Sequence, residues 1–193
     1  MKILLIDNHD SFVYNIVGLF CRCGVWRGDI SVVRNDAVDT IDIGAYSAIV
    51  LSPGPGLPSD AGALMRVVAE WAGRRPMLGI CLGHQAIVQH FGATLERLAA
   101  PRHGHPSRLR VTDLSDPLVG SLAGRGVTVG RYHSWRVREE SLPPCLRVTS
   151  VDEDGGIMSV SHTALPVWGL QFHPESVITD CGEEIINNML KLC

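Results

Sequence analysis

The sequence has no long apolar run and no cluster of basic residues. No apolar stretch approaches the roughly 20 residues that span a bilayer, and residues 1–7 lack the apolar core and cleavage site of a signal peptide. The formal net charge is −3, and Lys and Arg do not gather into a patch that could follow a phosphate backbone or an anionic membrane. We therefore expect a cytoplasmic protein that binds neither nucleic acid nor a membrane.

Paired cysteine motifs, internal repeats and linkers are also missing. The six cysteines are scattered without any C-x-x-C pair (Cys21, Cys23, Cys81, Cys145, Cys181 and Cys193). In a reducing compartment an even count is no evidence of disulfides, so most of these are expected to be free thiols. With 46% hydrophobic and 19% charged residues and no low-complexity tract, the chain reads as one globular domain over residues 1–193.

What is present is an alternation of strand-like and helix-like segments in the first half. Apolar runs predict strands at 2–6, 30–34, 47–52 and 77–81. Helical periodicity predicts helices at 11–23, 61–73 and 83–91. Asp10 or Ser11 is placed to cap the first helix and Gly24 to end it. Beyond residue 93, short β-rich segments precede a helix at 182–192. This order predicts an α/β fold: an open, mostly parallel twisted sheet with helices on both faces, plus flanking antiparallel β hairpins.

Cys81 stands at the end of one predicted strand, where open α/β sheets place their ligand sites. The segment G-I-C-L-G at 79–83 has the spacing of a nucleophile elbow, in which flanking glycines relieve a sharp strand-to-helix turn. The position at a helix N-terminus favours the thiolate. Cys81 is therefore a candidate nucleophile, and the alternative is a small buried cysteine that fills the end of the sheet.

A thiol nucleophile needs a base and a group that orients the base. His173 follows the apolar run V-W-G-L-Q-F, Pro174 favours an extended backbone, and Glu175 two residues on returns to the same face. The carboxylate could then hold the imidazole tautomer that accepts the thiol proton. The alternative is a polar turn before the last helix. A zinc deaminase signature also begins H-x-E, but its P-C-x-x-C is absent.

The segment S-P-G-P-G-L-P-S-D at 52–60 predicts a stiff loop whose unobstructed N–H groups suit an oxyanion hole; the alternative is a rigid turn. Ser59 replaces the third glycine of a dinucleotide fingerprint, and no G-K-[ST] follows for a P-loop. His103 and His105 have no further ligand cluster, so we interpret their segment as a solvated loop. We expect no cofactor and no metal.

Taken together, L-S-P-G-P-G-L-P-S-D-A-G, L-G-I-C-L-G-H-Q, R-Y-H-S-W and G-L-Q-F-H-P-E-S resemble the successive motifs of the class I glutamine amidotransferases. With D-N-H-D-S-F-V-Y-N at 7–15, the sequence is most similar to the glutaminase subunits (component II) of anthranilate synthase and aminodeoxychorismate (para-aminobenzoate) synthase. The resemblance runs from residue 3 to the last helix. Two departures are Trp135, where the family most often has Leu, and H-G-H-P at 103–106, where many relatives have H-G-K-[ST].

The resemblance implies a catalytic triad in which Cys81 attacks L-glutamine to form a γ-glutamyl thioester, His173 transfers the proton and Glu175 orients His173. Its substrate-binding positions, which include the backbone N–H groups of the oxyanion hole at Gly54 and Leu82, fall on Gly54, Pro55, Gly56, Leu82, Gln85, Ser134 and Trp135. The ammonia would pass to a chorismate-binding synthase subunit (component I), with the loop at 7–12 on the partner surface. Two alternatives are another elbow-type cysteine hydrolase or peptidase, and a non-catalytic scaffold of the same fold.

Overall fold

The computed structural model describes residues 1–193 and contains one large sheet of eight strands, in the order β2-β1-β3-β4-β10-β9-β8-β6. Its strands are β1 (Ile3–Asp7), β2 (Ile30–Arg34), β3 (Ala48–Leu51), β4 (Met77–Ile80), β6 (Arg110–Val111), β8 (Leu146–Val151), β9 (Ile157–His162) and β10 (Val167–Leu170). The five strands from β2 to β10 in this order are parallel, and the three beyond β10 are antiparallel. The predicted α/β fold with a mostly parallel sheet is confirmed.

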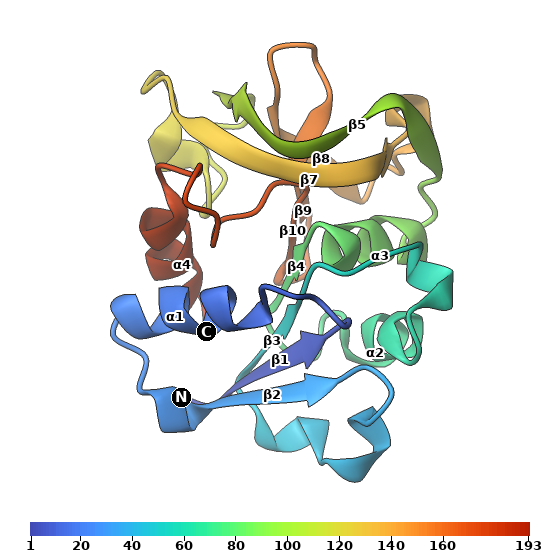
Figure 1. The fold of residues 1–193 in the computed structure, drawn as a ribbon, viewed down its shortest axis with the longest axis vertical. Coiled ribbons are helices and arrows are strands. Elements are labelled where there is room, and N and C mark those ends of the chain that lie inside the picture. The colour runs from blue at the N-terminus through green and yellow to red at the C-terminus, as the bar shows by residue number, and fades with distance from the viewer.

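Helices cover both faces of the parallel strands (Figure 1). The helices are α1 (Val13–Arg22), α2 (Leu64–Trp71), α3 (Leu82–His90) and α4 (Gly182–Leu190). Side chains alternate across a strand, so Ile3 and Leu5 of β1 pack in the core with α1 and α4, whereas Leu4 and Ile6 pack with α2 and α3. This two-sided burial explains why β1, β3 and β4 read as continuous apolar runs.

A separate two-stranded antiparallel ribbon pairs β5 (Leu95–Arg108) with β7 (Thr128–Val137) and lies across the top of the molecule in Figure 1. Its register places His103 opposite Tyr132, with irregularities between Arg97 and Arg102 and between His103 and His105. The prediction of a loop around His103 and His105 is wrong, because both residues belong to β5. The predicted exposure to solvent holds for His103 and Pro106. Short 3-10 helices complete the fold at Arg27–Asp29, Val38–Thr40, Ile43–Ala45, Pro58–Asp60, Gly120–Leu122 and Glu139–Ser141.

The start of α1 differs from the prediction. The helix begins at Val13, and its N-cap residue Phe12 makes no capping side-chain bond, so the expected cap by Asp10 or Ser11 is wrong. The chain instead turns through His9, at a positive φ of 59°, and the N–H of Asp10 donates to the Asp7 carboxylate over 3.0 Å. The end is as predicted, with Gly24 at φ 89° just past the helix. None of the helices is long and apolar enough to cross a membrane.

Candidate active site

The carboxyl ends of β1, β3, β4 and β10 meet at one edge of the sheet, and the predicted catalytic segments follow them there. Cys81 follows β4 directly, and His173 and Glu175 follow β10. The segment at 52–60, which we call the glycine loop, follows β3. The N–H of Cys81 donates to the carbonyl of Leu170 over 2.7 Å, which ties the end of β4 to the end of β10. Parallel pairing therefore brings together segments that are far apart in the sequence.

The turn at Cys81 has the strained geometry of an elbow. Cys81 has φ 50° and ψ −101°, a backbone conformation that non-glycine residues rarely adopt. A Cβ on Gly79 would lie 2.5 Å from the carbonyl carbon of Gly83, and a Cβ on Gly83 would lie 2.4 Å from the backbone oxygen of Leu51. Both glycines are therefore required by close backbone packing, and strain held at one position is typical of functional sites.

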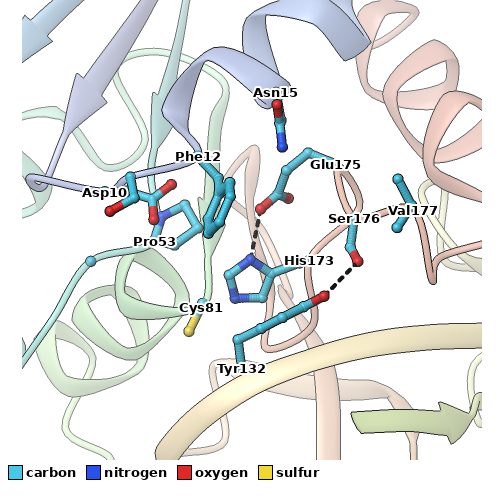
Figure 2. Close-up of a pocket in the computed structure, with 12 residues that line it drawn as sticks. Asp10, Phe12, Asn15, Pro53, Cys81, Tyr132, His173, Glu175, Ser176 and Val177 are labelled. Carbon is cyan, nitrogen blue, oxygen red and sulfur yellow. Dashed lines mark hydrogen bonds and ion pairs between the residues drawn. The ribbon is translucent and has the colours of Figure 1, made fainter. Parts of the chain in front are cut away.

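His173 lies between Cys81 and Glu175, as Figure 2 shows. Its Nδ1 is 2.6 Å from Oε1 of Glu175, and its buried Nε2 has no hydrogen-bond partner. Its backbone is fixed because its N–H donates to the carbonyl of Gly130 over 3.0 Å and its carbonyl accepts from the Thr179 hydroxyl over 2.6 Å. With Nδ1 engaged by a carboxylate, Nε2 is the nitrogen available to exchange a proton with the cysteine.

The surroundings of His173 favour its protonated form. Burial alone would lower the pKa of this imidazole, but the neighbouring Cys81 and Glu175 outweigh burial and raise the pKa above its ordinary value. Asp10 lines a cavity together with Cys81 and His173, and one of its carboxylate oxygens, Oδ2, is buried without a hydrogen-bond partner. Burial raises the pKa of Asp10, and the positive charge on His173 opposes that effect. The imidazole of His173 can therefore carry a positive charge inside this site.

The glycine loop is held tightly against the end of β1. The N–H of Asn8 donates to the Ser52 hydroxyl over 2.9 Å, and the side-chain amide of Asn8 donates to the Ser52 carbonyl over 2.8 Å. A Cβ on Gly54 would lie 2.5 Å from the carbonyl oxygen of Asn8, so the loop can approach this closely only with glycine. Leu82 is the first residue of α3, where the N–H has no partner within the helix.

Two cavities open on either side of Cys81, and Gly54 and Tyr132 line both of them. The first, which we call the β7 cavity, has a volume of about 260 Å³ and is lined by Gly54, Pro55, Gly56, Cys81, Gln85, His103, Tyr132, His133, Ser134 and Trp135. It contains every predicted substrate-binding position except Leu82, whose side chain packs in the core.

The second, which we call the α1 cavity, has a volume of about 380 Å³ and lies on the Glu175 side of Cys81. Asp10 and Phe12 contribute to its wall from the turn before α1, Asn15 contributes from the first turn of α1, and Val177 contributes from the segment after Glu175 (Figure 2). Phe12 and Val177 are exposed large apolar side chains at this opening. Cys81 is therefore reached from two directions.

Sequence reasoning missed four residues of the site. Tyr132 packs its ring edge-on against His173, with centroids 4.9 Å apart, and His103 and His133 line the β7 cavity. Gln171 places its side-chain nitrogen 3.8 Å from the Cys81 sulfur. A signal existed for Gln171, because it lies two residues before His173 in an extended segment and so shares its face. His103 had none, because only the β5–β7 register brings it to the cavity.

Comparison with known proteins agrees with this geometry. The family model described as glutamine amidotransferase class-I matches residues 4–193. The chain is 45% identical to anthranilate synthase component 2 of Pseudomonas aeruginosa, covering 98% of this chain and 94% of that protein. It is 43% identical to aminodeoxychorismate synthase component 2 of Escherichia coli, covering 97% of this chain and 98% of that protein.

Among solved structures, a glutamine amidotransferase of Thermotoga maritima superposes with a TM-score of 0.71 at 18% identity, covering 91% of this chain and 76% of that one. A protein of Thermoplasma acidophilum described as a GMP synthase subunit superposes with a TM-score of 0.86 at 26% identity, covering 100% and 94%. Both the fold and the sequence comparisons point the same way: this chain belongs to the class-I glutamine amidotransferase family.

Proposed function

We propose that this chain is the glutaminase subunit of a chorismate-using synthase. It hydrolyses L-glutamine at Cys81 and supplies ammonia to a separate subunit that makes anthranilate or 4-amino-4-deoxychorismate. The observation that carries the proposal is the imidazole of His173, fixed at Nδ1 by Glu175 and free at Nε2 beside a cysteine on a strained elbow. We further propose that residues 1–193 act as one domain and that the protein works in the cytosol.

In the first step the Cys81 sulfur attacks the side-chain carbonyl carbon of glutamine in the β7 cavity. The thiol proton is held by Nε2 of His173 when the sulfur attacks, because the raised pKa of the imidazole favours that transfer. The carbonyl oxygen becomes an oxyanion, for which the N–H groups of Gly54 and Leu82 are suited donors. Glu175 keeps the ring in the required tautomer and stabilises its positive charge.

In the second step the tetrahedral intermediate collapses. The carbon–nitrogen bond breaks, His173 returns its proton to the departing nitrogen, and ammonia leaves a γ-glutamyl thioester on Cys81. Water, deprotonated by the same imidazole, then attacks the thioester carbonyl. The carbon–sulfur bond breaks, glutamate departs and the Cys81 thiol is restored. Each proton is handled by one nitrogen, so the free Nε2 is sufficient for both half-reactions.

The partner surface in this proposal surrounds the α1 cavity. The two relatives named above are each a component 2 of a synthase, which supports a second subunit for this chain. Phe12 is 61% exposed and Val177 is fully exposed at the cavity opening, next to the loop at 7–12. Apolar side chains exposed together beside a catalytic cavity are suited to burial by a partner.

Two other functions compete with this proposal. A different cysteine hydrolase or peptidase could use the same elbow, and a scaffold would keep the fold without catalysis. The β7 cavity argues against the first, because a site of about 260 Å³ is small for a peptide. The intact contact between His173 and Glu175 argues against the second, because a scaffold has no need for a buried, oriented imidazole.

The test uses the chain reconstituted with a chorismate-binding subunit. Cys81→Ala should abolish product formation from glutamine and preserve product formation from ammonium, whereas Cys193→Ala, a change at an exposed cysteine, should alter neither. Glutamine-dependent synthesis that survived in Cys81→Ala would refute the proposal. Identifying the aminated product by mass spectrometry then distinguishes anthranilate from aminodeoxychorismate.

A further inference from the structure

A buried ion pair lies behind the β7 cavity and does not line it. The side chains of Arg131 on β7 and Asp152, which follows β8, are each 3% exposed and contact one another through Nη1 and Oδ2. Arg131 also donates to the Ser107 hydroxyl over 3.3 Å. A buried ion pair contributes little net stability once desolvation is counted. Its presence next to the cavity therefore calls for a reason other than stability.

Arg131 also contacts His133 and fixes which ring nitrogen of His133 carries the proton. Nε of Arg131 lies 3.1 Å from Nε2 of His133. A guanidinium can only donate, so Nε2 must accept and the ring proton must be on Nδ1. Nδ1 lies 2.8 Å from the carbonyl oxygen of Trp135, to which it therefore donates. Burial and the adjacent Arg131 lower the pKa of His133 to about 3, which keeps this ring neutral.

The same carbonyl then fixes the side-chain amide of Gln85. Nε2 of Gln85 donates to the Trp135 carbonyl over 2.9 Å and to Oε1 of Gln171 over 3.2 Å. Both hydrogens of the Gln85 amide are used in this way, so its oxygen is left as an acceptor in the β7 cavity. Nε2 of Gln171 in turn lies 3.8 Å from the Cys81 sulfur. The Trp135 carbonyl thus accepts from His133 on one side and from Gln85 on the other, and Gln85 donates onward to Gln171, which lies next to the nucleophile.

We propose that Arg131, held by Asp152, is a positioning residue for glutamine binding. Acting through His133, it holds the Trp135 carbonyl in the position at which that carbonyl accepts from the Gln85 amide, so that the cavity presents the Gln85 oxygen as an acceptor to an N–H group of the substrate. This inference rests on the proposed function, because it assumes that glutamine occupies the β7 cavity. If the Gln85 amide were reversed, its nitrogen would face the substrate's own donors and leave the Trp135 carbonyl with one donor fewer.

The experiment measures how well glutamine protects Cys81 from alkylation by iodoacetamide in the full-length chain, read by mass spectrometry. The glutamine concentration that halves the alkylation rate reports binding, and the rate without glutamine reports the nucleophile. In Arg131→Lys the ammonium can reach Asp152 but cannot also hold His133 in the geometry of the guanidinium. The matched control is Arg136→Lys, on the same strand, where Arg136 forms a half-exposed ion pair with Glu96.

A second pair of variants separates positioning from folding. The amide nitrogen of His133→Asn falls near the place of Nδ1 and can donate to the Trp135 carbonyl, whereas the amide of His133→Gln falls near the place of Nε2 and cannot. We expect the half-protecting glutamine concentration to rise about tenfold in Arg131→Lys and His133→Gln, and less than about threefold in His133→Asn and Arg136→Lys. The alkylation rate without glutamine should stay within about twofold in Arg131→Lys and Arg136→Lys.

Four results would overturn the proposal. An unchanged half-protecting concentration in Arg131→Lys and His133→Gln would refute it, and so would an equal rise in Arg136→Lys. A purely structural role would lower the thermal unfolding midpoint or the alkylated fraction without moving the half-protecting concentration. Failure of glutamine to protect the unmodified protein would refute the proposed function, and the positioning role with it.

Discussion

The charge of Glu175 can be tested apart from its shape. Glu175→Gln keeps an oxygen that can accept from Nδ1 of His173, so the ring orientation should survive while the negative charge is lost. The carboxylate is buried, with a side-chain exposure of 2%, and its Oε1 lies 2.6 Å from the ring nitrogen. Solvent screening at this position is therefore weak, and the loss of charge should be felt in full by the imidazolium.

The size of the effect follows from Coulomb's law. Opposite unit charges about 4 Å apart at an effective dielectric constant of about 20 attract by about 4 kcal/mol. Part of this stabilisation of the imidazolium is retained in Glu175→Gln, because the amide oxygen still accepts a hydrogen bond and the Asp10 carboxyl lies nearby. We therefore expect a loss of about 2–3 kcal/mol, which corresponds to a fall of about 30- to 200-fold in kcat/KM for glutamine. The raised pKa of His173 should fall in parallel.

The assay combines glutamate release by the reconstituted complex with the rate of Cys81 alkylation as a function of pH. Because the carboxylate helps to keep His173 protonated, its loss should make alkylation slower at neutral pH and move the full rate to more alkaline solution. Glu183→Gln is the control, since Glu183 pairs with Arg22 at the surface. The electrostatic reasoning would be refuted if glutamate release and neutral-pH alkylation in Glu175→Gln stayed within about twofold of the unmodified protein.

Two further predictions concern stability. Gly83→Ala should lower the free energy of unfolding by about 3 kcal/mol, because the new Cβ would meet the Leu51 carbonyl oxygen at 2.4 Å. Gly18→Ala, whose Cβ would meet nothing nearer than 3.6 Å, should raise the free energy of unfolding by about 0.5–1 kcal/mol. Urea unfolding measures both changes. The pKa values of His84 and His133 are lowered to about 3, mainly by burial, so only the unfolded chain gains protons as the pH falls through about 6.5. Between about pH 6.5 and 5.5 each of these two histidines should lower the free energy of unfolding by about 1 kcal/mol, and His84→Gln should remove its own share of about 1 kcal/mol. An equal fall in His84→Gln and the unmodified protein would contradict the argument.

Much of the parallel core could be predicted from the sequence, because its signals are local. Strands covered on both faces appear in the sequence as unbroken apolar runs. The elbow appears as a cysteine between two glycines, and close backbone packing leaves no room for a larger residue at either glycine. His173 and Glu175 were placed together by the two-residue period of an extended chain, and the structure joins them over 2.6 Å. Their catalytic roles remain proposals, but their juxtaposition was contained in the spacing.

The prediction was weaker where distant segments decide the outcome. The capping role assigned to Asp10 failed because the helix begins at Val13 with Phe12 as its N-cap residue, which leaves Asp10 two residues before the capping position. His103 was assigned to a loop because nothing near it in the sequence indicates that β5 pairs with β7. Register between strands that are separated along the chain depends on tertiary packing, and a local pattern does not contain it.

The segment R-Y-H-S-W shows how far a motif can be interpreted on its own. Arg131 and His133 lie two residues apart on an extended strand and are 3% and 4% exposed, so both must find polar partners inside the protein. The sequence indicates that need but not its solution, because Asp152, Gln85 and Gln171 come from other elements. Arg131 fixes the ring of His133, and the Trp135 carbonyl, which accepts from both His133 and Gln85, links that ring to the Gln85 and Gln171 amides beside the sulfur of Cys81. The specificity of the cavity is therefore set by the order of these hydrogen bonds as much as by the residues that line it.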